Sequence, residues 1–189
     1  SYHKISEDIR FGELKIHGEF KGNLGNPKGK IIWSAPQIVK IAKQQLSGKG
    51  TIIFGKKNIF LKDTVLNTDK GNLQIKGIGN ISSKKWSNLI VANNFSFNPL
   101  IKLSCTLIAC PKDLTNQPIV FRKGTIRLTG QLNNLTINSF ESLEKILFSV
   151  GESSIYIQTK FSKKHIAGNI FISDLLFNRY FSLLPTSVN

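Results

Sequence analysis

Gly71-Asn72-Leu73-Gln74-Ile75-Lys76-Gly77 is the clearest copy of a phrase that occurs four times in this chain of 189 residues. Each copy begins with a glycine and has Ile or Leu two and four residues later; the others begin at Gly12, Gly124 and Gly168. Successive side chains of a strand point to opposite faces, so each copy predicts a strand with one apolar and one mainly polar face. The copies are too unevenly spaced for a solenoid repeat. They favour a long meander in which one type of strand recurs between variable hairpins.

The rest of the sequence also favours strands. Segments rich in branched and aromatic residues alternate with turn-forming clusters such as Gly22 to Pro27 and Gly55 to Asn58. Strand pairs are predicted within residues 11–33, 50–66, 72–97, 119–137 and 153–173, with a further apolar strand at 101–109. Short strands bounded by turn residues indicate an all-β fold. The glycines at the ends of the repeated strands are expected to set the curl of the sheet: Gly18, Gly71, Gly77, Gly124 and Gly130.

At most one or two short helices are expected. Apolar residues recur at helical spacing from Phe140 to Val150, Asn138 and Glu141 match a capping box, and Gly151 matches a helix stop. This pattern predicts a helix at 139–149, and a second candidate spans 175–184. The apolar positions between 37 and 46 fit a helix and a partly buried strand equally well.

The composition limits the possible functions. The chain contains no methionine, so we expect a processed or excised piece and interpret residues 1–189 as a single segment of a longer array. The formal net charge is +15, but only four of the 26 basic residues are arginine, the residue best suited to phosphate and base contacts. We therefore expect no nucleic-acid partner. Codon bias and attraction to an anionic membrane surface both remain explanations of the charge.

The two cysteines are expected to be buried free thiols. Cys105 and Cys110 lie within an apolar stretch that is predicted to be a strand. In an extended strand their Cα atoms would be about 16 Å apart, whereas a disulfide requires less than about 7 Å. The residues between them are poor turn formers.

The sequence predicts no enzyme. His3, His17 and His165 lack the spacing of metal ligands, so no metal site is expected. The acidic residues are spread thinly and form no pair suited to acid–base catalysis. The sequence also contains no nucleophile elbow, phosphate loop or dinucleotide fingerprint. We therefore expect no catalytic residue and no cofactor.

Phenylalanine occurs 13 times and often flanks the repeated strands. Aromatic residues favour the half-buried face of a sheet, so these residues fit an ordinary core. They fit equally well a groove of Ile, Leu and Phe that stays open to receive acyl chains.

Three stretches resemble the repeat of the TamB family. Leu14 to Ile31 contains the pattern apolar-x-Gly-x-apolar-x-Gly-x-apolar, followed by Pro, Gly and a new strand. Leu66 to Gly77 resembles the family's Thr-x-x-Gly-x-Leu-x-x-x-Gly module, and Gly124 to Leu135 resembles it again. Together these stretches cover about half the chain. The basic charge, the predicted helix at 139–149 and the uneven spacing depart from the family pattern.

TamB and related AsmA-like proteins, including plastid counterparts, are anchored in an inner membrane and cross to a second envelope membrane. The resemblance implies an elongated, curled, mainly antiparallel sheet, shaped like a taco, whose open groove receives phospholipid acyl chains. It also implies a periplasmic or other inter-envelope location, an inner-membrane anchor outside this segment, and an Omp85-type outer-membrane barrel as partner. The implied function is non-enzymatic support of lipid transfer between membranes and of outer-membrane protein assembly.

The candidates to line the lipid groove are the apolar residues of the four repeats: Leu14, Ile16, Leu73, Ile75, Ile126, Leu128, Ile170 and Ile172. Their polar neighbours Glu13, Lys15, Gln74 and Arg127 are expected to face water. The alternative is a compact β-sandwich or barrel that binds an acidic partner or nucleic acid through a basic surface.

Overall fold

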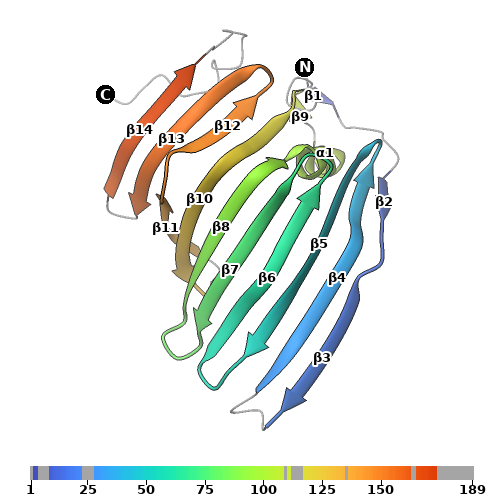
Figure 1. The fold of residues 1–189 in the computed structure, drawn as a ribbon, viewed down its shortest axis with the longest axis vertical. Coiled ribbons are helices and arrows are strands. Elements are labelled where there is room, and N and C mark those ends of the chain that lie inside the picture. Colours follow the sequence, from blue (N-terminus) through green and yellow to red (C-terminus); the bar gives the residue numbers. More distant parts are fainter. Residues whose placement is uncertain are drawn as a thin grey trace.

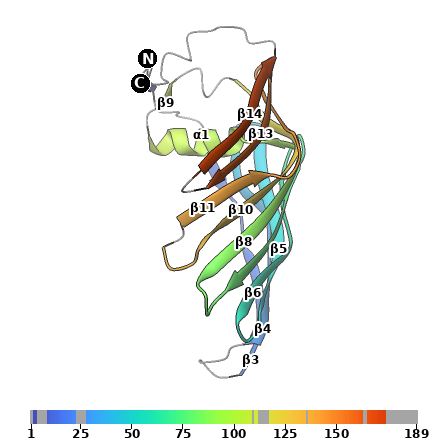
Figure 2. The same ribbon diagram turned by 90° about the vertical axis from the view of Figure 1, so that its left-hand side faces the viewer.

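The structure is a computed structural model that describes residues 2–3, 9–22, 28–108, 110–111, 117–134, 136–162 and 165–173. These residues form a large antiparallel sheet of 12 strands, one helix and a separate pair of very short strands (Figure 1). The sheet is curled, and helix α1 lies on the side around which it curves (Figure 2). The predicted all-β fold with a curled, mainly antiparallel sheet is confirmed.

The strands of the large sheet are β2 (Ile9–Phe11), β3 (Lys15–Lys21), β4 (Lys28–Ile41), β5 (Gln44–Phe54), β6 (Asn58–Thr68), β7 (Asn72–Asn80), β8 (Lys85–Ser96), β10 (Ile119–Gln131), β11 (Thr136–Ser142), β12 (Ile146–Val150), β13 (Ser153–Ser162) and β14 (His165–Ser173). Helix α1 (Asn98–Leu107) follows β8, and β1 (Tyr2–His3) pairs with β9 (Cys110–Pro111).

The sheet is a meander. From β4 to β8 each strand pairs with its neighbours in sequence, and β10 continues the sheet beside β8 after the excursion through α1. In two places, two consecutive short strands occupy one position in the sheet and are separated by a break. β2 and β3 both lie along β4, and β11 and β12 both lie between β10 and β13. The hairpins predicted within 50–66 and 72–97 are present, whereas residues 23–27 lie outside the described part of the chain.

The helix predicted at 139–149 is wrong, because these residues belong to β11 and β12. Between the two strands the amide of Leu143 donates a hydrogen bond of 2.9 Å to the carbonyl of Thr125 in β10, so the chain stays attached to the sheet. Phe140 of β11 and Ile146 of β12 lie on the same face of the sheet, six residues apart. Leu143, in the break between the two strands, gives an apolar residue at every third position, which imitates a helical face.

The strand predicted at 101–109 is also wrong, because α1 occupies most of that segment. Pro99 lies in the first turn of the helix, where its fixed φ and missing amide are tolerated. The sequence of residues 37–46 fitted a helix and a strand equally well. In the structure these residues form the end of β4, a turn at Ala42, whose φ is 53°, and the start of β5. The second helix candidate, 175–184, lies outside the described residues.

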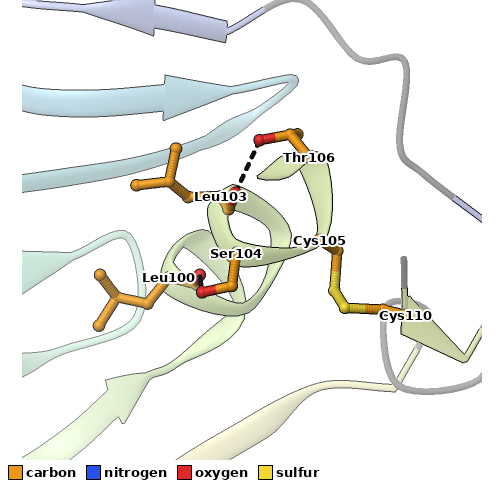
Figure 3. Close-up of a disulfide and its surroundings, with 6 residues drawn as sticks. All are labelled: Leu100, Leu103, Ser104, Cys105, Thr106 and Cys110. Atoms are coloured by element: carbon orange, nitrogen blue, oxygen red, sulfur yellow. Dashed lines mark hydrogen bonds between the residues drawn. A yellow bond between two sulfur atoms is a disulfide. The ribbon is translucent and has the colours of Figure 1, made fainter. Parts of the chain in front are cut away.

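Cys105 and Cys110 form a disulfide, which corrects the expectation of free thiols (Figure 3). Their Cα atoms are 5.3 Å apart, because α1 is helical at Cys105 and the chain turns after its last residue. Leu100 and Leu103 point from the opposite side of the helix towards the strands. The disulfide therefore joins the outer side of α1 to β9.

The core is concentrated under α1. Its buried members come from one end of the strands and from β12: Val39, Ile41, Leu46, Leu73, Ala92, Phe95, Phe121, Ile126 and Ile146. Leu100 and Leu103 of α1 pack against this cluster. The helix thus covers one end of the sheet, and its position determines which part of the sheet face is buried.

Candidate functional site

The two faces of the sheet differ in chemistry. Residues paired across neighbouring strands share a face, and alternate residues along a strand share a face. The observed register therefore assigns every regular position of β3 to β8 and of 123–131 in β10 to one face. We call the face that carries α1 the concave face and the opposite one the convex face (Figure 2).

The concave face is apolar. At these positions its described residues include no lysine, arginine, histidine, aspartate or glutamate. Two neighbouring rows of residues cross the strands on this face beyond the core. The outer row contains Phe20, Gly29, Phe54, Ile59, Gly79, Trp86 and Gly130. The second row contains Gly18, Ile31, Ile52, Leu61, Gly77, Asn88 and Leu128.

The two rows remain partly open to solvent. Phe20 is 59% exposed, and Phe54, whose ring lies 5.7 Å from that of Phe20, is half-buried. Ile31, Ile52 and Leu61 are half-buried as well. None of the residues in these rows belongs to the buried cluster under α1. The concave face thus has a covered end, where α1 lies, and an open end, formed by the two rows.

Glycines let aromatic rings lie against the backbone of the concave face. A Cβ atom on Gly130 would lie 2.5 Å from the Trp86 ring, and one on Gly50 would lie 2.7 Å from Nε1 of Trp33. Trp86 is held in place by a hydrogen bond of 3.1 Å from its Nε1 to the Gln131 carbonyl. In the outer row, large apolar residues and glycines are interspersed. The result is a mainly apolar surface, with Asn88 as a polar side chain in the second row and no charged side chain among its described residues.

The predicted groove residues fall into three groups. Leu73, Ile75, Ile126 and Leu128 share the concave face and lie in or against the buried cluster. Ile16 is on the same face of edge strand β3 but is 63% exposed, and Leu14, which precedes the strand, is 60% exposed. Ile170 and Ile172 pair with Ile157 and Ile155 in the sheet, but their side chains lie outside the described part of the structure.

The polar neighbours Glu13, Lys15, Gln74 and Arg127 are exposed, as predicted. Alternation therefore assigned the faces of the second and third repeats correctly. It did not find the residues of the outer row, most of which lie outside the repeated phrase. In this row glycine and aromatic residues of adjacent strands lie opposite each other on one face. This pattern can be recognised only once the register of the strands is known.

The convex face is basic. Its ionisable residues at regular strand positions are Lys15, His17, Glu19, Lys21, Lys28, Lys30, Lys40, Lys49, Lys62, Lys76, Lys85, Lys123 and Arg127. At the edge of this face Glu141 of β11 binds Arg127 at 3.5 Å and Lys160 at 3.1 Å. His17 lies 3.6 Å from Glu19, and both side chains are exposed.

No group of three or more His, Cys, Asp or Glu side chains within the described ranges could hold a metal ion. In the same part of the chain, no helix has the length and apolar character needed to cross a membrane.

Comparisons of the chain with protein-family models, with curated proteins and with solved structures give no match. The function must therefore be argued from the two faces of the sheet.

Proposed function

We propose that the concave face binds the acyl chains of phospholipids. The observation that carries the proposal is the open end, where half-buried apolar side chains lie together and no described residue on the same face is ionisable. A soluble protein rarely leaves a contiguous apolar surface uncovered unless the surface binds something. Each CH₂ group that moves from water to such a surface contributes about 0.8 kcal/mol.

The dimensions of the open end suit an acyl chain. The outer row crosses seven strands, from β3 to β10. Neighbouring strands lie about 4.8 Å apart, so the row is roughly 29 Å long. The hydrocarbon core of a bilayer, which contains two layers of chains, is about 30 Å thick. One extended chain therefore fits along the row with room to spare.

The absence of charge at the described positions of the open end favours acyl chains over a polar ligand. A charged or strongly polar ligand would lose its hydration there without gaining a partner. An acyl chain has no favourable hydration to lose. It can also slide along the face, because no hydrogen bond or ion pair fixes its position. A row of this type therefore permits movement along the groove as well as binding.

The wider proposal adds the resemblance to the TamB family. We propose that the chain is a non-enzymatic segment of an envelope-spanning β-groove protein, which supports lipid transfer between membranes and outer-membrane protein assembly beside an Omp85-type barrel. Its location would be the periplasm or another inter-envelope space. The disulfide between Cys105 and Cys110 supports this location, because disulfides persist in oxidising compartments and are rare in the cytosol.

Two adjacent isoleucines of β5 provide the test. Ile52 lies on the concave face in the second row, Ile53 lies on the convex face, and both are half-buried. We expect Ile52→Asp to remain folded but to lose co-purifying phospholipid in native mass spectrometry and transfer of lipid between vesicles of phosphatidylcholine, which carry no net charge. Ile53→Asp is the matched control and should retain both properties.

The alternatives make different predictions. If wild-type protein carries no phospholipid and transfers none, the groove proposal fails and a purely structural role replaces it. If both Asp variants lose lipid equally, binding does not depend on the concave face. Circular dichroism spectra of both variants establish that a loss of lipid is not a loss of fold.

A further inference from the structure

We propose that the convex face docks on the surface of an anionic lipid bilayer. Six lysines of this face come from five successive strands, β4 to β8: Lys28, Lys30, Lys49, Lys62, Lys76 and Lys85. All six side chains are exposed. This proposal concerns a different surface from the acyl-chain groove and stands whether or not that groove binds lipid.

The lysines of the convex face have few acidic partners in the part of the chain that the structure describes. No ion pair among the described residues involves any of these six lysines. Glu141, at the edge of the face, already binds Arg127 and Lys160. Lys28 is directly opposite Lys21 of β3, and like charges in that position repel each other. The neighbouring pair has opposite charges, Glu19 opposite Lys30, so an anionic surface would relieve repulsion at Lys28 and Lys21 in particular.

Apolar residues lie between the lysines, and they favour a bilayer over nucleic acid. Ile78, which is 43% exposed, lies with Phe60 and Leu89 in a shallow hollow of about 450 Å³. Lys62 and Lys76 line the same hollow together with one exposed acidic residue, Asp63, so the hollow has a net positive charge. A membrane interface offers phosphate groups beside apolar chain segments, so it complements both kinds of side chain at once. A nucleic-acid backbone would leave the apolar residues without a partner.

The predominance of lysine over arginine on the convex face also favours a bilayer over nucleic acid. Arginine, with its planar fork of donors, is the residue that reads bases and binds phosphates in a bidentate way. Among the described paired positions the register places two arginines on the convex face: Arg127, which is engaged with Glu141, and Arg10 of β2, which lies opposite Lys40. Lysines act as point charges, and a laterally mobile lipid surface can adapt to their spacing. Each lysine near such a surface strengthens binding about fivefold.

The test is sedimentation of the purified chain with vesicles of phosphatidylcholine and phosphatidylglycerol, compared with vesicles of phosphatidylcholine alone. We expect binding to the anionic vesicles only, and we expect added salt to weaken it. The variant Lys62→Glu/Lys76→Glu should bind the anionic vesicles at least twentyfold more weakly, since about fivefold is lost for each lysine. Both side chains are exposed and line the shallow hollow, and Lys62 lies at a bulge of β6. Thermal melting must therefore confirm that the variant is folded.

A second variant controls for net charge. Lys43 and Lys70 are exposed residues in the turns after β4 and β6, outside the convex face, and Lys43→Glu/Lys70→Glu changes the net charge by the same amount. It should lose much less affinity than the Lys62/Lys76 variant. Equal losses would overturn the proposal, because binding would then follow total charge. Absence of binding to anionic vesicles would also overturn it, as would tighter binding to a duplex DNA at the same ionic strength.

A concave-face variant separates this proposal from the acyl-chain groove. Ile52→Asp changes the opposite face, and it should sediment with anionic vesicles nearly as well as the unaltered chain. If Ile52→Asp abolishes sedimentation while the Lys62/Lys76 variant retains it, the membrane contact is made by the concave face and the proposal is wrong.

Discussion

The covered and open ends of the concave face are built from the same strands, yet only one of them is a core. Leu73 is 7% exposed because α1 and the buried cluster lie over it, whereas Ile52, on the same face, remains half-buried. Both positions have a branched apolar side chain on the concave face. The difference teaches that alternation specifies a face, while the burial of that face depends on an element that comes from elsewhere in the chain.

The two ends also differ in how they tolerate change. A filled core has no room for a new group and no water for a new charge. The open end has solvent on one side, so a substitution there alters the surface more than the fold. Substitutions made at both ends therefore test whether one end is buried and the other open, and they also test the proposed function.

The largest effect is expected from a charge under α1. Ile126→Asp places a carboxylate without a partner in the buried cluster, and we expect it to lower the free energy of unfolding by about 4 kcal/mol. Ile52→Asp at the open end should lower it by only about 1 kcal/mol, because water can still reach the carboxylate. Urea denaturation of both variants measures the difference. Similar losses would mean that the open end is covered in solution.

The next largest effect concerns the two glycines on either side of Trp86. A Cβ atom on Gly130 would collide with the ring of Trp86 and with the carbonyl of Thr136, whereas one on Gly79 would make ordinary contact with Leu132 at 3.4 Å. We expect Gly130→Ala to destabilise the fold by about 3 kcal/mol, as overpacking does.

Gly79→Ala serves as the matched control, and its melting temperature should stay close to that of the unaltered chain. The sequence alone predicts a role in curvature for Gly130 and the other repeat glycines. Equal melting temperatures of the two variants would show that Gly130 acts as an ordinary strand residue. A loss confined to Gly130→Ala would tie its role to the packing of Trp86.

The strand order and the faces of the central strands could be predicted from the sequence, because both depend on local patterns. Alternation around Gly71 and Gly124 placed Leu73 and Ile126 on the inner face and Gln74 and Arg127 on the outer one. Turn residues such as Gly55 to Asn58 marked a hairpin that the structure contains. These features need no information from distant parts of the chain.

Features that depend on distant contacts could not be predicted. Ile101 to Leu107 has the composition of a strand, but its leucines pack against the sheet as a helix, and Cys105 then comes within reach of Cys110. At 139–149 a break in a strand copied the spacing of a helix. Ile16 follows the repeat pattern but lies on an edge strand that nothing described covers, so the pattern alone could not indicate its exposure.

A smaller effect is expected from the disulfide at the covered end. Cys105→Ala/Cys110→Ala removes a bond that closes a loop of six residues, which should lower the free energy of unfolding by about 2 kcal/mol. Hydrogen exchange should locate the change. Amides of α1 should exchange faster, while those of β5 and β6 at the open end should be unaffected. Faster exchange throughout the sheet would indicate that the two ends unfold together.

The smallest effect is expected from the ion pairs of Glu141 on the convex side. Its carboxylate lies between Arg127 and Lys160, whose side chains are 49% and 70% exposed, so water screens both interactions. Such pairs contribute about 0.5 kcal/mol, and we expect Glu141→Gln to lower the free energy of unfolding by that amount and no more in high salt. Glu152→Gln, in the turn between β12 and β13, is a control with the same chemistry. A loss above about 2 kcal/mol for Glu141→Gln would show that convex-face charges stabilise the sheet itself, and the lysines of that face would then need an explanation within the fold before one at a membrane.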